Sequence, residues 1–148
     1  MTGARPFRRV LVGWDASRHA AAALNAAAAI VGDGEGHVVA LAVLPAAGHA
    51  ETAGERSANE SAARQRVRAP FERLHAELAA PRGVRISLAF TQDSHVSRAL
   101  CGYATEHGFD MLVLGRHGEG GVLGGKLGHV AEAAVRSAPI PVLVVSAA

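Results

Sequence analysis

The chain has 148 residues, of which 49% are hydrophobic and 4% aromatic, and this length suffices for one domain with a buried core, which we expect to span residues 1–148. Its 15 Lys and Arg and 13 Asp and Glu leave a formal charge of +2, which argues against a nucleic-acid binder, and the single cysteine, Cys101, excludes an intrachain disulfide. Apolar runs are too short for a signal peptide or a membrane span, so we expect a soluble, cytoplasmic protein with no membrane partner.

The first elements alternate between strand and helix. Residues 9–14 form a short apolar run that predicts a strand, and either Asp15 or Ser17 after it can cap a helix. The alanine-rich segment 19–31 predicts that helix. A continuous apolar run over 37–44 then predicts a second, buried strand.

The middle of the chain predicts a loop, a long helix and a third strand. Small and polar residues over 46–57 indicate a loosely packed loop. Apolar residues three and four apart predict a helix from about 58 to 79, in which Pro70 should cause a kink or a break. Strict alternation over 84–90 is typical of a strand at a sheet edge.

The last third continues the alternation. We expect helices over 94–107 and 128–138, and strands over 110–114 and 142–145. Five apolar strands separated by four helices predict an α/β fold, a parallel, doubly wound, Rossmann-like sheet covered on both faces.

Two segments follow strand ends and should meet at one edge of that sheet, where ligands bind in such folds. One is 13–17, and the other is the glycine-rich stretch 115–129, which leads into a helix. Glycine lets backbone N–H groups approach an anion, and a helix N-terminus adds free donors, so 115–129 is suited to holding phosphates. A flexible loop that is merely glycine-rich is the alternative. The stretch does not match a Walker A motif, and the segment after the first strand has a single glycine, Gly13, where a dinucleotide fingerprint needs three.

Three motifs in order resemble the universal stress protein family. Gly115-x-x-Gly118, nine residues and then Gly128 match the glycine motif of its nucleotide-binding members. Residues 10–17 resemble the family's first strand and turn, and residues 138–145 resemble its last strand. The chain departs from the motif at His129, where the family has Ser or Thr.

The resemblance implies strand order 3-2-1-4-5, bound ATP with Mg²⁺ as a candidate companion, and a homodimer through residues 142–145. It implies that Asp15 lies beside the ribose or the metal, and that the backbone near Val43 meets the adenine. The nucleotide-binding residues carried over are Gly13, Trp14, Asp15, Val43, Gly115, Arg116, His117, Gly118, Gly128, His129 and Val130. A role for Asp15 as a helix cap is compatible with this role.

Three functions remain open at this point. The first is an ATP-binding regulatory module of the stress response, with at most slow ATP hydrolysis and no assigned catalytic residue. The second is a dimeric interaction protein of the same fold that has lost ATP because His129 replaces the hydroxyl residue. The third is a phosphoryl- or nucleotidyl-transferring enzyme, for which we find no recognisable motif. His117 and His129 do not have the spacing of a metal site.

Overall fold

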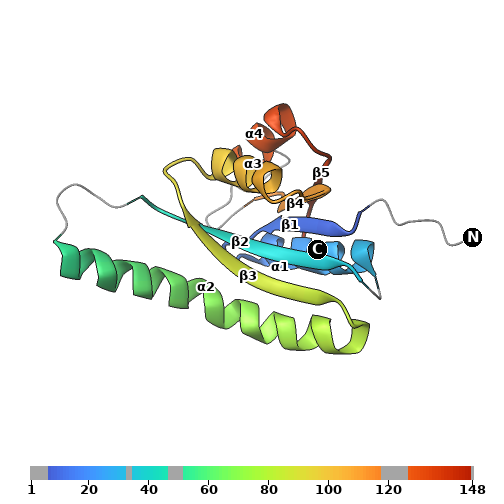
Figure 1. The fold of residues 1–148 in the computed structure, drawn as a ribbon, viewed down its shortest axis with the longest axis horizontal. Helices are drawn as coiled ribbons and strands as arrows, with labels where there is room; N and C mark the ends of the chain where they lie inside the picture. Colours follow the sequence, from blue (N-terminus) through green and yellow to red (C-terminus); the bar gives the residue numbers. More distant parts are fainter. Residues whose placement is uncertain (1–6, 33–34, 47–51, 118–126, 148) are drawn as a thin grey trace, which may run out of the picture.

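The computed structural model describes residues 7–32, 35–46, 52–117 and 127–147. These residues form five strands and four helices in strict alternation (Figure 1). The elements are β1 (Arg9–Gly13), α1 (Arg18–Val31), β2 (His37–Leu44), α2 (Ala53–Arg82), β3 (Arg85–Gln92), α3 (Val96–Glu106), β4 (Met111–Gly115), α4 (His129–Ser137) and β5 (Val142–Val145).

All strand pairs are parallel, and the sheet order is β3-β2-β1-β4-β5. This confirms the predicted fold class and strand order, and it puts β3 at a sheet edge as its alternation indicated. Helices α1 and α2 cover one face of the sheet, and α3 and α4 cover the other (Figure 1). The winding direction reverses between β1 and β4, so the segments that follow these two strands flank one crevice.

Each face of the sheet has its own hydrophobic cluster. The α1–α2 side is built largely from small residues of α1, and four of its alanines are fully or almost fully buried: Ala20, Ala23, Ala27 and Ala28. Their short side chains let α1 lie close to the central strands. Larger aliphatic side chains dominate the α3–α4 side, including Leu11, Leu41, Leu100 and Leu112.

Helix α2 corrects the predicted loop over 46–57 and excludes a break at Pro70. It begins at Ala53, inside the segment 46–57 that we expected to be a loop, because Thr52 and Glu55 form a reciprocal capping box. It also runs through Pro70 without a break. Proline removes the donor for the carbonyl of Arg66, and Arg66 is exposed, so water can satisfy that group. The part of the predicted loop over 47–51 lies outside the described residues.

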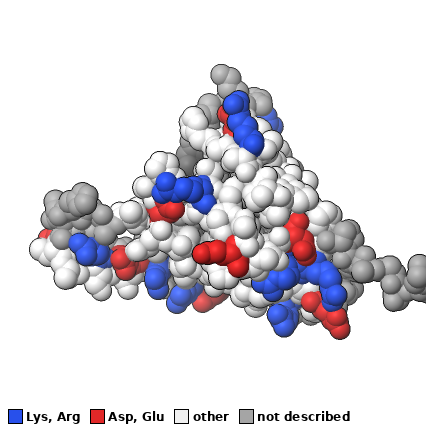
Figure 2. Space-filling view, turned by 45° about the horizontal axis from the view of Figure 1, so that its top comes forward, with Lys and Arg blue, Asp and Glu red and all other residues white. Residues whose placement is uncertain are grey.

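The two halves of α2 differ in burial. The predicted apolar face is confirmed in the second half, where Val67, Phe71 and Leu78 are buried and Leu74 is partly buried. In the first half, residues 53–66, no side chain is buried. On the face in view in Figure 2, basic and acidic side chains lie beside one another and do not separate into blocks. Among the described helices, none is long and apolar enough to cross a membrane.

Candidate functional site

A pocket of about 870 Å³ lies at the carboxyl ends of β1, β2 and β4. Its volume is within the range of small-molecule sites. It contains every predicted site residue that the structure describes, namely Gly13, Trp14, Asp15, Val43, Gly115, Arg116, His117, Gly128, His129 and Val130. The remaining one, Gly118, lies outside the described residues.

One side of the pocket is apolar. Leu41 and Val43 of β2 line it together with Val96 and Leu100 of α3. Trp14, directly after β1, completes this apolar wall. The wall offers a surface for a flat, weakly polar group.

Trp14 is fixed within the protein. Its indole Nε1 donates a hydrogen bond to the backbone carbonyl of Val67, at 2.9 Å. Its ring packs edge-on against Phe71, with 6.1 Å between ring centroids, and its backbone N–H donates to the carbonyl of Leu41 at 2.9 Å. The polar atom of the indole is therefore already satisfied, and Trp14 presents only apolar surface to the pocket.

The turn after β1 is tightly organised. The N–H of Ser17 donates to Oδ1 of Asp15 at 2.9 Å, and Oγ of Ser17 accepts from the N–H of Ala20 at 3.1 Å. Ser17 is therefore the N-cap of α1, and Asp15 holds the turn that precedes it. Between them, Ala16 has a φ of +66°, a left-handed conformation that favours glycine.

The opposite side, called the polar wall, carries most of the polar groups of the pocket and consists of the residues after β4 and the start of α4, with Leu127, Val130 and Ala131 among them. Two glycines there allow close packing without positive φ. A Cβ on Gly115 would lie 2.7 Å from the backbone of His19, and a Cβ on Gly128 would lie 3.2 Å from the carbonyl of Arg116. The N–H of Gly128 donates to that carbonyl at 2.8 Å. These contacts hold the start of α4 next to the end of β4.

Helix α4 points its N-terminus into this polar wall. Gly128 is its N-cap and supplies no side-chain hydrogen bond, and His129 is its first residue. The first N–H groups of a helix have no acceptor inside it, so those of His129 and Val130 are suited to an anion. Glu132, in the same turn, also lines the pocket and pairs with Arg136 at 2.9 Å.

His117 is the most enclosed polar side chain of the wall. It is 8% exposed, and its Nδ1 has no hydrogen-bond partner among the described residues. Its ring lies edge-on to that of His19, with 5.6 Å between centroids. Nδ1 of His19 accepts a hydrogen bond from the N–H of Ala147 at 3.0 Å. Burial, followed by the charge of Arg18, lowers the pKa of His19.

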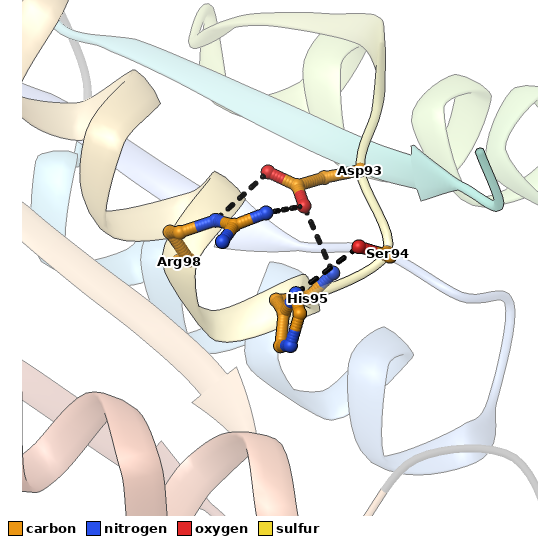
Figure 3. Close-up of polar contacts among 4 residues, drawn as sticks. All are labelled: Asp93, Ser94, His95 and Arg98. Atoms are coloured by element: carbon orange, nitrogen blue, oxygen red, sulfur yellow. Dashed lines mark hydrogen bonds and ion pairs between the residues drawn. The ribbon is translucent and has the colours of Figure 1, made fainter.

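A second, more open groove of about 800 Å³ runs along α3 and was not expected from the sequence. Asp93 and Arg98 at its rim form an ion pair, and Asp93 also accepts the N–H of His95 at 2.9 Å (Figure 3). The hydrogen bond from Arg98 lowers the pKa of Asp93. Burial raises the pKa of Cys101, which also lines this groove, so its thiol stays protonated.

Several lining residues of the larger pocket were missed by sequence reasoning, above all Val96 and Glu132. Both lie in the first turn of a helix that follows a strand. That position faces the carboxyl edge of the sheet in a parallel α/β fold, and this signal could have identified them. No group of three or more His, Cys, Asp or Glu in the described ranges could hold a metal ion.

The chain is similar to several solved structures of one family. It is 26% identical to a universal stress family protein from Burkholderia pseudomallei, with a TM-score of 0.72 and coverage of 97% of this chain and 98% of that one. It is 22% identical to a universal stress protein crystallised in complex with cAMP, with a TM-score of 0.70 and coverage of 97% and 99%. An Arabidopsis thaliana family protein with AMP bound is 17% identical, with a TM-score of 0.60 and coverage of 95% and 92%.

The last two similarities, at their low identity, show the fold alone. A comparison with curated proteins finds no match. The family model described as "Universal stress protein family" matches residues 6–146. Because that match includes nearly the whole chain, the chain belongs to the universal stress protein family.

Proposed function

We propose that this chain is one nucleotide-binding domain that binds ATP at the pocket described above and acts as a homodimeric regulatory module of the stress response in the cytoplasm. The observation that carries the proposal is the polarity of the pocket. The lining from β2 and α3 is apolar, whereas the imidazoles of His117 and His129, the guanidinium of Arg116 and the N-terminus of α4 come from the segments after β4, on the other side of β1. A nucleotide has the same polarity, with a flat base at one end and an anion at the other.

The roles of the residues follow from their positions along the sheet edge. The base lies at Val43 and the neighbouring apolar side chains, because β2 forms that end of the pocket. Asp15, after β1, lies between the two walls and accepts from the ribose hydroxyls. Gly115, Gly118, Gly128 and His129 surround the phosphates, and the free backbone N–H groups in the first turn of α4, those of His129 and Val130, bind them.

Magnesium fits this site only together with the nucleotide. Asp15 is a single carboxylate, and one of its oxygens already accepts the N–H of Ser17. Mg²⁺ needs six oxygen ligands and commonly takes them from one or two carboxylates, phosphates and water. Asp15 would hold it, and the metal would neutralise phosphate charge.

Dimerisation through β5 is the second part of the proposal. β5 is an edge strand made only of valine and leucine, and all four of its residues are partly exposed. Val135 of α4 adds an exposed apolar side chain, at 53%. An apolar edge strand aggregates unless it is paired, and a second copy pairs it. A Val144→Lys variant should be monomeric in sedimentation, and a wild-type monomer at micromolar concentration would refute the dimer.

A second candidate function is a dimeric interaction protein that no longer binds nucleotide. Glu132 favours it, since a carboxylate in the first turn of α4 repels phosphate. His129 in place of a hydroxyl residue favours it as well.

One experiment separates the two functions. Purified protein is denatured, and the supernatant is analysed for adenine nucleotide, while refolded or stripped protein is titrated with ATP. Trp14 is the only tryptophan and lines the pocket, so its fluorescence reports binding. Saturable quenching supports the nucleotide site. If no nucleotide is released and ATP does not change the fluorescence, the second candidate function, a dimeric interaction protein, is supported.

A further inference from the structure

Exposed apolar side chains gather at the larger pocket. Among the described residues, the exposed large apolar side chains are Val96, Leu127 and Val135, at 39%, 41% and 53%. Val96 and Leu127 line the larger pocket, and Val135 does not. All other exposed positions of α3 and α4 carry polar side chains or glycine. Apolar surface that is exposed at one place, rather than scattered singly, indicates a binding site.

These two side chains belong to an apolar strip from α3 and α4. The strip consists of Val96, Leu100, Leu127, Val130 and Ala131, all of which line the pocket. Its inner end is buried, with Leu100 at 1% and Ala131 at 2% exposure, and its outer end is the exposed pair. The two helices are in contact and lie on the same face of the sheet (Figure 1). The strip therefore leads from the core under these helices to solvent.

The strip borders the end of the pocket that we assign to the phosphates. Leu127 directly precedes Gly128, the N-cap of α4, and Val130 lies in the first turn, where backbone N–H groups are free to bind an anion. The base, in the proposed function, lies at Val43 of β2, on the other side of β1. A triphosphate offers no apolar surface to a leucine side chain. ATP alone would therefore leave the outer end of the strip uncovered.

Glu132 gives an independent indication about the phosphate. Its carboxylate is in the first turn of α4 and lines the same pocket. It pairs with Arg136 at 2.9 Å, but both side chains are more than half exposed, so the pair is weak. A free terminal phosphate carries a charge of about −1.5 to −2 near pH 7, and an ester bond removes its second ionisation. Glu132 therefore repels an esterified phosphate less than a free one.

We propose that the ligand of this pocket is a nucleotide whose terminal phosphate carries an aliphatic chain, and that this chain lies on the apolar strip, against Val96 and Leu127. This inference rests on the proposed nucleotide function and adds to it a preference for the esterified nucleotide over ATP. Burial of one methylene group increases affinity roughly fourfold. Affinity should therefore rise with the length of the chain until the strip is covered.

The test is titration with three ligands at saturating Mg²⁺: ATP, its γ-methyl ester and its γ-hexyl ester. Fluorescence of Trp14 reports binding, and wild type is compared with Leu127→Ser and with Val135→Ser, an exposed control outside the pocket. The Kd of the methyl ester divided by that of the hexyl ester isolates the chain, because base and charge are the same in both. We expect a ratio of about ten or more in wild type and Val135→Ser, and a ratio at least about threefold lower in Leu127→Ser.

The charge argument has its own variant, Glu132→Gln. Wild type should bind the methyl ester more tightly than ATP. Glu132→Gln should reduce that preference, because an amide does not repel the second charge of a free phosphate. A preference of the same size in both proteins would contradict the role of Glu132.

Other outcomes overturn the inference. Equal affinities of wild type for the methyl and hexyl esters contradict it while leaving the nucleotide site intact, and so does an unchanged ratio in Leu127→Ser. If Leu127→Ser does not fold, nuclear Overhauser effects between the hexyl chain and the methyl groups of wild-type Val96 and Leu127 decide instead. Their presence supports the inference, and their absence refutes it. Failure of wild type to bind any of the three ligands would refute the proposed function and this inference together.

Discussion

The apolar and polar walls of the pocket are built in different ways. The apolar wall has its polar side-chain group paired inside the protein, because the indole N–H of Trp14 donates to the carbonyl of Val67. The polar wall leaves groups unsatisfied among the described residues: Nδ1 of His117 has no partner, and the first turn of α4 has no side-chain cap. Polar atoms that are already paired inside the protein cannot bind a ligand, whereas unpaired donors and acceptors can form hydrogen bonds with one. The polar wall should therefore decide what binds, and the apolar wall should decide how rigidly the pocket is held.

The largest effect should come from crowding the polar wall at Gly115. In Gly115→Ala the new Cβ would meet the backbone of His19 at 2.7 Å, and backbone cannot rotate away. Overpacking of this kind costs about 1–3 kcal/mol of unfolding free energy. The matched control is Gly102→Ala in α3, where no atom lies within 4 Å of the new Cβ and alanine favours the helix. Urea denaturation measures both, and equal stability of the two variants would contradict the close packing.

The apolar wall should respond to loss of the indole hydrogen bond. Trp14→Phe keeps an aromatic ring against Phe71 but removes the donor to the carbonyl of Val67. We expect a loss of about 1–2 kcal/mol from the missing bond and the smaller ring. Denaturation followed by circular dichroism tests this, because the variant has no tryptophan. Unchanged stability would mean that the hydrogen bond from Trp14 to α2 does not stabilise the fold.

The turn between the two walls should gain stability from glycine. Ala16 has a φ of +66°, which costs an L-residue roughly 1–2 kcal/mol. Glycine removes that strain but adds freedom to the unfolded chain, worth about 0.4–1 kcal/mol. Ala16→Gly should therefore raise the unfolding free energy by about 0.5–1 kcal/mol, which thermal denaturation can resolve. A destabilised variant would contradict the strained turn.

The smallest effect should be local, at His19 of α1, whose ring packs against His117 of the polar wall. The pKa of His19 is lowered from 6.5, so below that pH the unfolded chain binds more protons than the folded one. The stabilising contribution of neutral His19 is thus complete above about pH 6.5 and is lost as the pH falls through the lower folded value. The N–H of Ala147 should then exchange faster with solvent, while the indole N–H of Trp14 should not. His19→Asn should remove this pH dependence, because an amide oxygen accepts at any pH in this range.

The fold could be predicted from the sequence because its strands are short, apolar and regularly separated by helices. The prediction from composition was wrong where a side-chain hydrogen bond starts a helix in a polar segment. Residues 53–57 looked like a loop, yet the capping box of Thr52 and Glu55 starts α2 there. A kink or a break was expected at Pro70, and the break is absent because buried residues on both sides of it, Val67 and Phe71, hold α2 against the sheet.

The place of the candidate site could be predicted from its glycines and from the strand ends. The packing contacts that its residues make could not. Gly115 was expected to approach an anion, and the structure adds a packing reason for glycine there, because a Cβ would meet the backbone of His19 of α1. The contact between His19 and His117 joins positions 98 residues apart in a chain of 148 residues, and no spacing rule indicates it. Such contacts depend on tertiary packing, which a single sequence does not display.

The central claim is that nucleotide binds at the carboxyl edge of β1, β2 and β4. Titration of ¹⁵N-labelled protein with ATP, followed by amide chemical shifts, tests it most directly. We predict saturable shifts at Val43, Gly115, Gly128 and Val130, and none at Gly83, which precedes β3 at the opposite, amino edge of the sheet. Shifts confined to Arg98 and Cys101 in the groove along α3, or no saturable shift at millimolar ATP, would contradict the account.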